Sequence, residues 1–225
     1  MNKDLTEIVF ILDRSGSMGH LTTDTIGGYN AFIDKQKRES GAALVTTVLF
    51  DDYYEILHNA VDIRHINPLT DKDYFVRGAT ALLDAIGKTI NGTISRAKIL
   101  KDEYKAGKVI FVIITDGYEN ASREYSYSAI KKMIDHQTEK YSWEFLFLGA
   151  NIDAAAEGEK MGIRRDRSAN FMASHEGSAK LYANVSDNVS FYRNEGSIKE
   201  GWDQSLKEDT KPESKPVRKS KALLT

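Results

Sequence analysis

Short apolar stretches alternate with longer stretches of helical periodicity along most of this chain. Residues 8–12 and 109–114 are unbroken apolar runs, the pattern of a strand covered on both faces. Residues 81–100 place leucine and isoleucine at intervals of three and four, the pattern of an amphipathic helix. The pattern predicts strands over residues 8–12, 43–50, 54–61, 109–114, 143–148 and 170–172, and helices over residues 22–38, 81–100, 129–137, 153–161 and 176–193.

The order of these elements defines the predicted fold. Strands that are separated by helices pair in parallel, and the helices then cover both faces of the sheet. The second and third strands are joined only by a short turn at Asp51 and Asp52, which predicts an antiparallel hairpin. We therefore predict an α/β fold: a doubly wound, Rossmann-like, mostly parallel six-stranded sheet with one antiparallel edge strand and helices on both faces.

The composition supports one globular core. Of the 225 residues, 41% are hydrophobic and 28% are charged, close to average globular usage. Two of the three prolines, Pro212 and Pro216, stand in a polar and charged stretch that begins at Ser205. Such a stretch buries too little apolar surface to fold by itself. We predict one domain over residues 1–200 and a disordered polar tail over residues 201–225.

Charge, hydropathy and cysteine content limit which partners and which cellular location we expect for this protein. The 31 lysine and arginine residues are balanced by 33 aspartate and glutamate residues, which argues against a nucleic-acid partner. No apolar run reaches the roughly 18 residues of a membrane helix, and the first residues do not resemble a secretory signal. The chain has no cysteine, which excludes disulfides, thiolate metal sites and cysteine nucleophiles. We expect a cytoplasmic protein with no membrane partner.

Candidate chemistry lies in three loops that can meet at one end of the sheet, where doubly wound folds bind ligands. After the first strand, oxygen-bearing side chains stand at alternate positions. The loop before the helix over 81–100 and the loop after the strand over 109–114 each supply one more such side chain. These candidate residues are Asp13, Ser15, Ser17, Thr80 and Asp116. Two carboxylates and three hydroxyls suit a hard cation, Mg²⁺ or Mn²⁺, better than Zn²⁺ or Cu²⁺.

At these positions the sequence resembles the von Willebrand factor type A family, whose fold is also that of the integrin inserted domain. The resemblance covers about residues 5–193 and rests on the D-x-S-x-S loop at residues 13–17, Thr80 and Asp116. It implies that the five candidate residues form a metal-ion-dependent adhesion site. A carboxylate from an Asp or Glu of a partner protein would fill an open position on the metal.

The same resemblance is nearest to the bacterial, cytoplasmic branch of the family, which includes proteins of tellurium-resistance and phage-type gene neighbourhoods. It implies an interaction module with no catalytic residues. An ATPase of the same operon is one partner that this branch suggests.

Three sets of residues beside the candidate loops each allow two interpretations. Arg14 is expected to be exposed, either steering an acidic partner or standing as a solvated charge. Asp51 and Asp52 favour a hairpin turn, with support of the metal site as the alternative. Glu119 and Asn120 are expected in a polar loop or on the rim of the site.

An enzyme is the competing functional class, most plausibly a metal-assisted phosphatase on a similar α/β sheet. Phosphatases of the haloacid-dehalogenase type also carry an Asp after the first strand, but they need a second acid two residues later, where this chain has Ser15. Neither Ser15 nor Ser17 has the flanks of a serine hydrolase, and no phosphate-binding or dinucleotide glycine motif is present. The sequence therefore favours a binding module.

Overall fold

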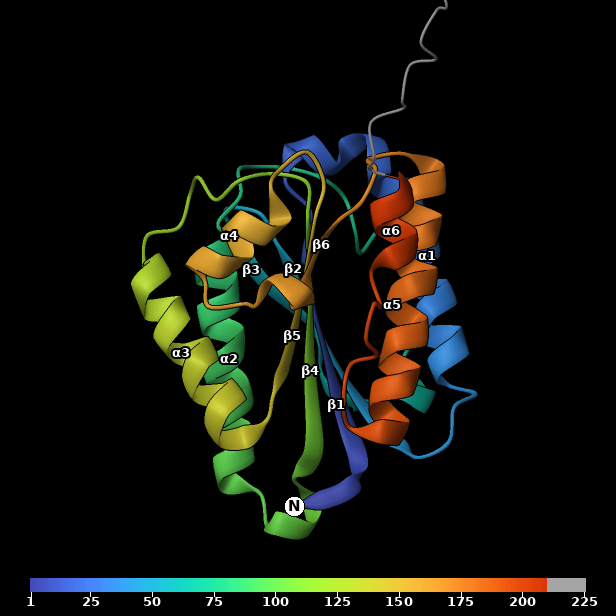
Figure 1. The fold of residues 1–225 in the computed structure, drawn as a ribbon, viewed down its shortest axis with the longest axis vertical. Coiled ribbons are helices and arrows are strands. Elements are labelled where there is room, and N and C mark those ends of the chain that lie inside the picture. Colours follow the sequence, from blue (N-terminus) through green and yellow to red (C-terminus); the bar gives the residue numbers. More distant parts are fainter. Residues whose placement is uncertain (210–225) are drawn as a thin grey trace, which may run out of the picture.

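The computed structural model describes residues 1–209 and contains one six-stranded sheet with the order β3-β2-β1-β4-β5-β6 (Figure 1). All neighbouring strands pair in parallel except β2 and β3, which are antiparallel. The strands are β1 (Asn2–Asp13), β2 (Ala42–Phe50), β3 (Tyr54–Asp62), β4 (Ala106–Thr115), β5 (Glu144–Gly149) and β6 (Ser168–Asn170). The predicted fold class, with its single antiparallel edge strand, is confirmed.

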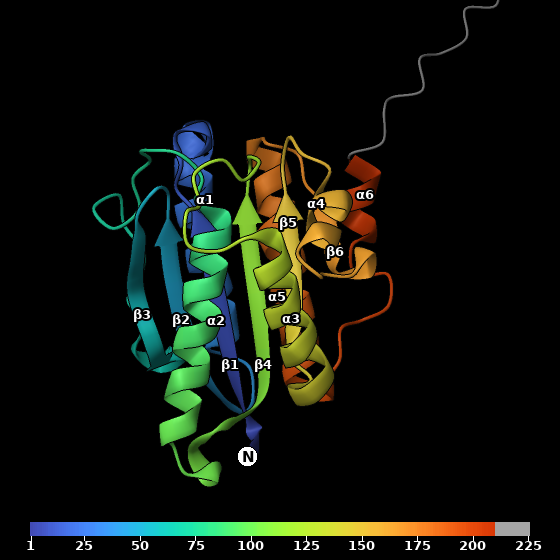
Figure 2. The same cartoon turned by 90° about the vertical axis from the view of Figure 1, so that its left-hand side faces the viewer.

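Helices cover both faces of this sheet (Figures 1 and 2). They are α1 (Thr22–Gln36), α2 (Leu82–Ile99), α3 (Tyr127–Tyr141), α4 (Ala154–Lys160), α5 (His175–Glu195) and α6 (Gln204–Asp209). One layer holds α1, α5 and α6, and the opposite layer holds α2 and α3, with α4 beside β6. Within residues 1–209, no helix combines the length and apolarity needed to cross a membrane.

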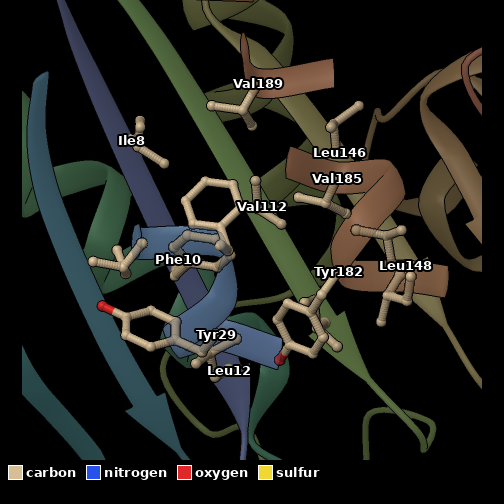
Figure 3. Close-up of a cluster of buried hydrophobic side chains, with 14 of the residues drawn as sticks. Ile8, Phe10, Leu12, Tyr29, Val112, Leu146, Leu148, Tyr182, Val185 and Val189 are labelled. Carbon is tan, nitrogen blue, oxygen red and sulfur yellow. The ribbon is translucent and has the colours of Figure 1, made fainter. Parts of the chain in front are cut away.

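The central strand β1 explains why the fold has two cores. Its residues 8–12 are fully buried, and the twofold alternation of a strand sends successive side chains to opposite faces. Ile8, Phe10 and Leu12 enter the core beneath α1 and α5, which Figure 3 shows, whereas Val9 and Ile11 enter the core beneath α2 and α3. An unbroken apolar run is therefore what this position requires.

The last strand differs from the prediction. Strand β6 has three residues and ends at Asn170, whereas the sequence pattern placed a strand over residues 170–172. The Asn170 side chain donates to the carbonyl of Gly149 and accepts from the amide of Ala154. The Phe171 amide still donates to the Gly149 carbonyl (3.1 Å), and the apolar Phe171 packs in the core as a loop residue.

The predicted disorder after residue 200 is wrong for residues 201–209. Trp202, in the turn before α6, is only 5% exposed, and Leu206 of α6 is buried in the same core. The indole Nε1 of Trp202 donates to the Asp166 carbonyl (2.8 Å), and Asn184 of α5 donates to the Trp202 carbonyl. Two apolar anchors thus hold a polar segment on the core, and the rest of the predicted tail, residues 210–225, lies outside the described residues.

Replacing Trp202 with alanine should lower the free energy of unfolding by about 3 kcal/mol, because it removes a buried ring and leaves a cavity. Urea denaturation followed by circular dichroism measures this change. The matched control is Glu200→Ala at an exposed neighbouring position, which should change stability by less than about 0.5 kcal/mol. Equal stability of the two variants would mean that the segment does not pack as described.

Candidate metal site

The candidate residues gather where the strand order reverses. The chain passes from β1 through α1 to β2 on one side, and from β4 through α3 to β5 on the other, while β1 and β4 are direct neighbours. Loops leaving the carboxyl ends of such a pair diverge and leave a crevice between them. Asp13 is the last residue of β1, and Asp116 follows directly after β4.

Asp13 is fully buried and held through all its oxygens. Its Oδ1 accepts from the Ser15 amide (2.7 Å), its Oδ2 accepts from the Thr115 hydroxyl (2.6 Å), and its carbonyl accepts from the Tyr74 hydroxyl (2.5 Å). Burial raises the pKa of Asp13 to about 6; the bonds from Thr115 and Ser15 oppose this rise, and the nearby Asp116 adds to it. The carboxylate is therefore held in place by hydrogen bonds from neutral groups, and no basic side chain is among these partners.

A chain of oxygen atoms links the first loop to Asp116. The Ser15 and Ser17 hydroxyls are 3.2 Å apart, and the Ser17 hydroxyl donates to Oδ1 of Asp116 (2.5 Å). The other oxygen of Asp116, Oδ2, is buried and has no hydrogen-bond partner. Ser15 and Asp116 are buried while Ser17 is exposed, so the group opens to solvent on the Ser17 side.

Thr80 reaches the same place from the loop before α2. Its amide donates to the Asn120 side chain (2.9 Å), and its carbonyl accepts from the Asn120 amide (3.0 Å), which joins this loop to the loop after β4. The hydroxyl oxygens of Thr80 and Ser17 both lie within 4 Å of the point where a Cβ on Gly117 would stand. The structure thus brings all five predicted residues together, and their role as metal ligands stays a prediction.

The donor set fits a hard divalent cation. Residues 1–209 contain no group of three or more histidine, cysteine, aspartate or glutamate side chains placed to hold a metal ion. An ion at this edge would therefore depend on hydroxyls in addition to Asp13 and Asp116, and hydroxyl and carboxylate oxygens are ligands of Mg²⁺ and Mn²⁺. A buried carboxylate oxygen without a partner is costly unless something pairs with it, and a cation would do so.

Arg14 is buried rather than exposed, which corrects the sequence-based reading. It is 0% exposed, its Nε donates to Asp51 Oδ2 (3.2 Å), and its Nη2 lies 2.7 Å from Glu55 Oε2. Its backbone is also fixed, since its amide donates to the Phe50 carbonyl and its carbonyl accepts from the Arg77 amide. Arg14 therefore stabilises the loop after β1 through buried contacts, and its charge is not exposed to a partner protein.

Asp51 is the acceptor that organises these contacts. Its Oδ1 accepts from the Tyr53 amide (2.6 Å), which is the predicted hairpin turn. Its Oδ2 also accepts from Arg77 Nε (2.6 Å), and its carbonyl accepts from the Ala81 amide (2.9 Å). The turn reading is confirmed, and Asp51 in addition connects the hairpin to the loop that carries Thr80.

Gly78 is the position where this loop needs glycine. Its φ is +66°, and a Cβ there would lie 1.8 Å from Asp52 Oδ1. Its carbonyl accepts from the Gly16 amide (3.2 Å), which places the loop before α2 directly against the loop after β1. Any larger residue at position 78 would strain the backbone, because of the positive φ, and its Cβ would collide with the Asp52 side chain.

Glu119 and Asn120 fasten the loop after β4 to the start of α2. Glu119 Oε2 accepts from the Leu83 amide (2.9 Å) and its Oε1 accepts from the amides of Ala121 and Ser122. Asp84, which sequence reasoning missed, completes the junction: its carboxylate accepts from the three successive amides of residues 123–125. An acidic residue in the first turn of a helix was the available signal.

Comparison with known proteins supports the fold. No protein-family model matches the sequence, and no curated protein matches it. Among solved structures, manganese-loaded TRAP protein of Plasmodium vivax matches with a TM-score of 0.57 and 18% identity, over 80% of this chain and 73% of that one. Proximal thread matrix protein 1 from the mussel byssus, with a zinc-occupied metal-ion-dependent adhesion motif, matches with a TM-score of 0.56 and 14% identity, over 84% and 47%.

A von Willebrand factor type A structure from Catenulispora acidiphila also matches, with a TM-score of 0.54 and 10% identity, over 84% of this chain and 43% of that one. At such identities the likeness concerns the fold, and this chain therefore has the fold of von Willebrand factor type A domains. It spans about half the length of the mussel protein. The matched proteins come from distant organisms, so they do not place the chain in a bacterial branch.

Replacing Arg14 with alanine should lower the free energy of unfolding by about 3 kcal/mol, because it leaves Asp51 buried with one cationic partner fewer. Thermal or urea unfolding measures the loss. Arg165→Ala is the matched control, because Arg165 is exposed and pairs on the surface with Glu159, and it should change stability by less than about 1 kcal/mol. Similar values for both variants would contradict the bracing role.

Proposed function

We propose that this protein is a metal-dependent interaction module. Asp13, Ser15, Ser17, Thr80 and Asp116 hold Mg²⁺ or Mn²⁺ at the carboxyl edge of the sheet, and the ion binds a carboxylate of an Asp or Glu from a partner protein. The observation that carries the proposal is Oδ2 of Asp116, a buried carboxylate oxygen without a hydrogen-bond partner, on a side chain whose other oxygen accepts from the Ser17 hydroxyl. The ion would supply the positive charge that Asp13 and Asp116 lack.

The ligand count explains why an outside carboxylate is expected. Serine and threonine hydroxyls are neutral, so the two aspartates at most neutralise the charge of the ion. Ser17 stands on the solvent side of the group, where a partner can approach. Two of the matched structures are described as manganese-loaded and as holding zinc in the adhesion motif, which supports a divalent ion at the same edge here.

The proposal includes no catalytic activity. A phosphatase of the haloacid-dehalogenase type needs an acid two residues after Asp13, and here that residue is Ser15, whose hydroxyl lies 3.2 Å from that of Ser17. No observation therefore favours the enzyme over the binding module. A cytoplasmic location, with an ATPase of the same operon as one partner, rests on the family resemblance alone.

The metal assignment predicts that Asp116→Asn weakens binding of Mg²⁺ or Mn²⁺ at least tenfold, because the amide keeps the shape of the side chain and removes its charge. Isothermal titration calorimetry on the purified protein measures the affinity. Asp102→Asn is the control, since Asp102 is an exposed aspartate at the opposite end of the molecule. The metal assignment fails if the Asp116 variant binds either ion as tightly as the parent.

The partner assignment predicts that peptides selected from a random library in the presence of Mg²⁺ contain an essential Asp or Glu. Thr80→Ala should weaken their binding at least tenfold, or about 1.4 kcal/mol, because one ligand of the ion is lost. EDTA should abolish the binding, and Thr138→Ala, an exposed position on α3, should leave it unchanged. Peptides that bind equally well in EDTA would show that recognition uses another surface.

A further inference from the structure

A second site lies at the opposite end of the sheet from the candidate metal residues. A cavity of about 820 Å³ opens between α2 and α3, over the first residues of β4 and just before β5. Figure 2 shows these two helices side by side in front of the sheet. The volume falls within the usual range of roughly 300–1,000 Å³ for small-molecule sites. The metal residues stand at the carboxyl ends of the strands, so the two places are separated by the length of β4.

The apolar wall of this cavity ends in a stack of aromatic rings. Phe145 stacks on Phe111 (4.8 Å between ring centroids, 27° between planes), and Phe111 stacks on Trp143 (5.5 Å, 21°). Trp143 is the outermost ring of the three and lines the cavity together with Val109 and Met133. A planar ring is the shape that would extend such a stack.

An unpaired hydroxyl also lines the cavity. Thr93 is 2% exposed, and its Oγ1 is buried without a hydrogen-bond partner. One turn earlier on the same helix, the hydroxyl of Thr89 donates to the Ala85 carbonyl (2.6 Å), the usual way for a helical threonine to be satisfied. Buried polar atoms in folded proteins are nearly always paired, so the Thr93 hydroxyl is an unsatisfied polar atom in the wall of the cavity.

The charges around the cavity favour an anion. The two acidic side chains that line it are already paired, Glu7 with Arg96 and Asp102 with Lys105. Lys98 and Lys132 also line it and form no ion pair with any of the residues 1–209. Lys98 belongs to α2 and Lys132 to α3, and both residues are exposed.

We propose that this cavity binds a planar aromatic carboxylate. The ring lies against Trp143, the Thr93 hydroxyl bonds a polar atom of the ligand, and the carboxylate is held by Lys98 and Lys132. This site is independent of the proposed metal function, because none of its residues belongs to the metal edge.

The probe for the test is 2-naphthoate, titrated into the full chain by isothermal calorimetry. It should bind at least tenfold more tightly than 2-naphthol, which has the ring without the carboxylate, and than octanoate, which has the carboxylate without the ring. EDTA should not change its affinity. Binding of octanoate as tight as that of 2-naphthoate, or no binding of 2-naphthoate at millimolar concentration, would overturn the proposal.

Variants then locate the probe. Lys98→Gln combined with Lys132→Gln should weaken 2-naphthoate at least tenfold, whereas Lys72→Gln combined with Lys199→Gln, two exposed lysines elsewhere, should not. Thr93→Val should weaken it several-fold, whereas Thr89→Val should not, because the Thr89 hydroxyl is satisfied within its helix. Unchanged affinity in the first lysine pair, with the fold verified by circular dichroism, would place the probe elsewhere and reject this site.

Discussion

The buried carboxylate of Asp51 is the contact on which the geometry of the metal edge depends. Asp51 follows directly after β2, and its carboxylate binds Arg14 of the first loop, the turn amide of its own hairpin, and Arg77 of the loop that carries Thr80. One carboxylate accepts from the Nε of two guanidinium groups, while the Nη atoms of Arg14 are buried without a hydrogen-bond partner and Nη2 is paired with Glu55 by charge alone. Three loops from distant parts of the sequence are thereby held at fixed separations before any ion binds.

This dependence explains what the sequence could and could not predict. The alternation of apolar runs and helical stripes was sufficient for the fold class, because the inner strands of a doubly wound sheet are covered on both faces and must be apolar on both. The exposure of Arg14 could not be predicted, because its acidic partner lies 37 residues away and meets it only in the folded chain. The same limit applies to Tyr74, whose hydroxyl donates to the Asp13 carbonyl 61 residues away.

The composition of the region after residue 200 predicted disorder there, and it failed to predict the packing of residues 201–209 for a related reason. A segment can be polar on average and still pack if a few apolar residues in it are buried, as Trp202 before α6 and Leu206 within α6 are. An average over the segment hides these two positions. The candidate site was easier to locate in the sequence, since Asp13, Ser15 and Ser17 are close together and their loop follows an unbroken apolar run.

Helix α2 lies beside both the proposed metal site and the proposed aromatic-carboxylate site. The hydrogen bonds that hold its first turn indicate that the two sites act separately. Its first turn is fixed by the Ala81 amide on Asp51, the Leu83 amide on Glu119, and the carboxylate of Asp84 on three amides of the loop after β4. Coupling between two sites requires an element with two arrangements that both ligands bias. A helix anchored so firmly at the metal end offers no such element, so a ligand beside Thr93 and Lys98 would leave Thr80 where it stands.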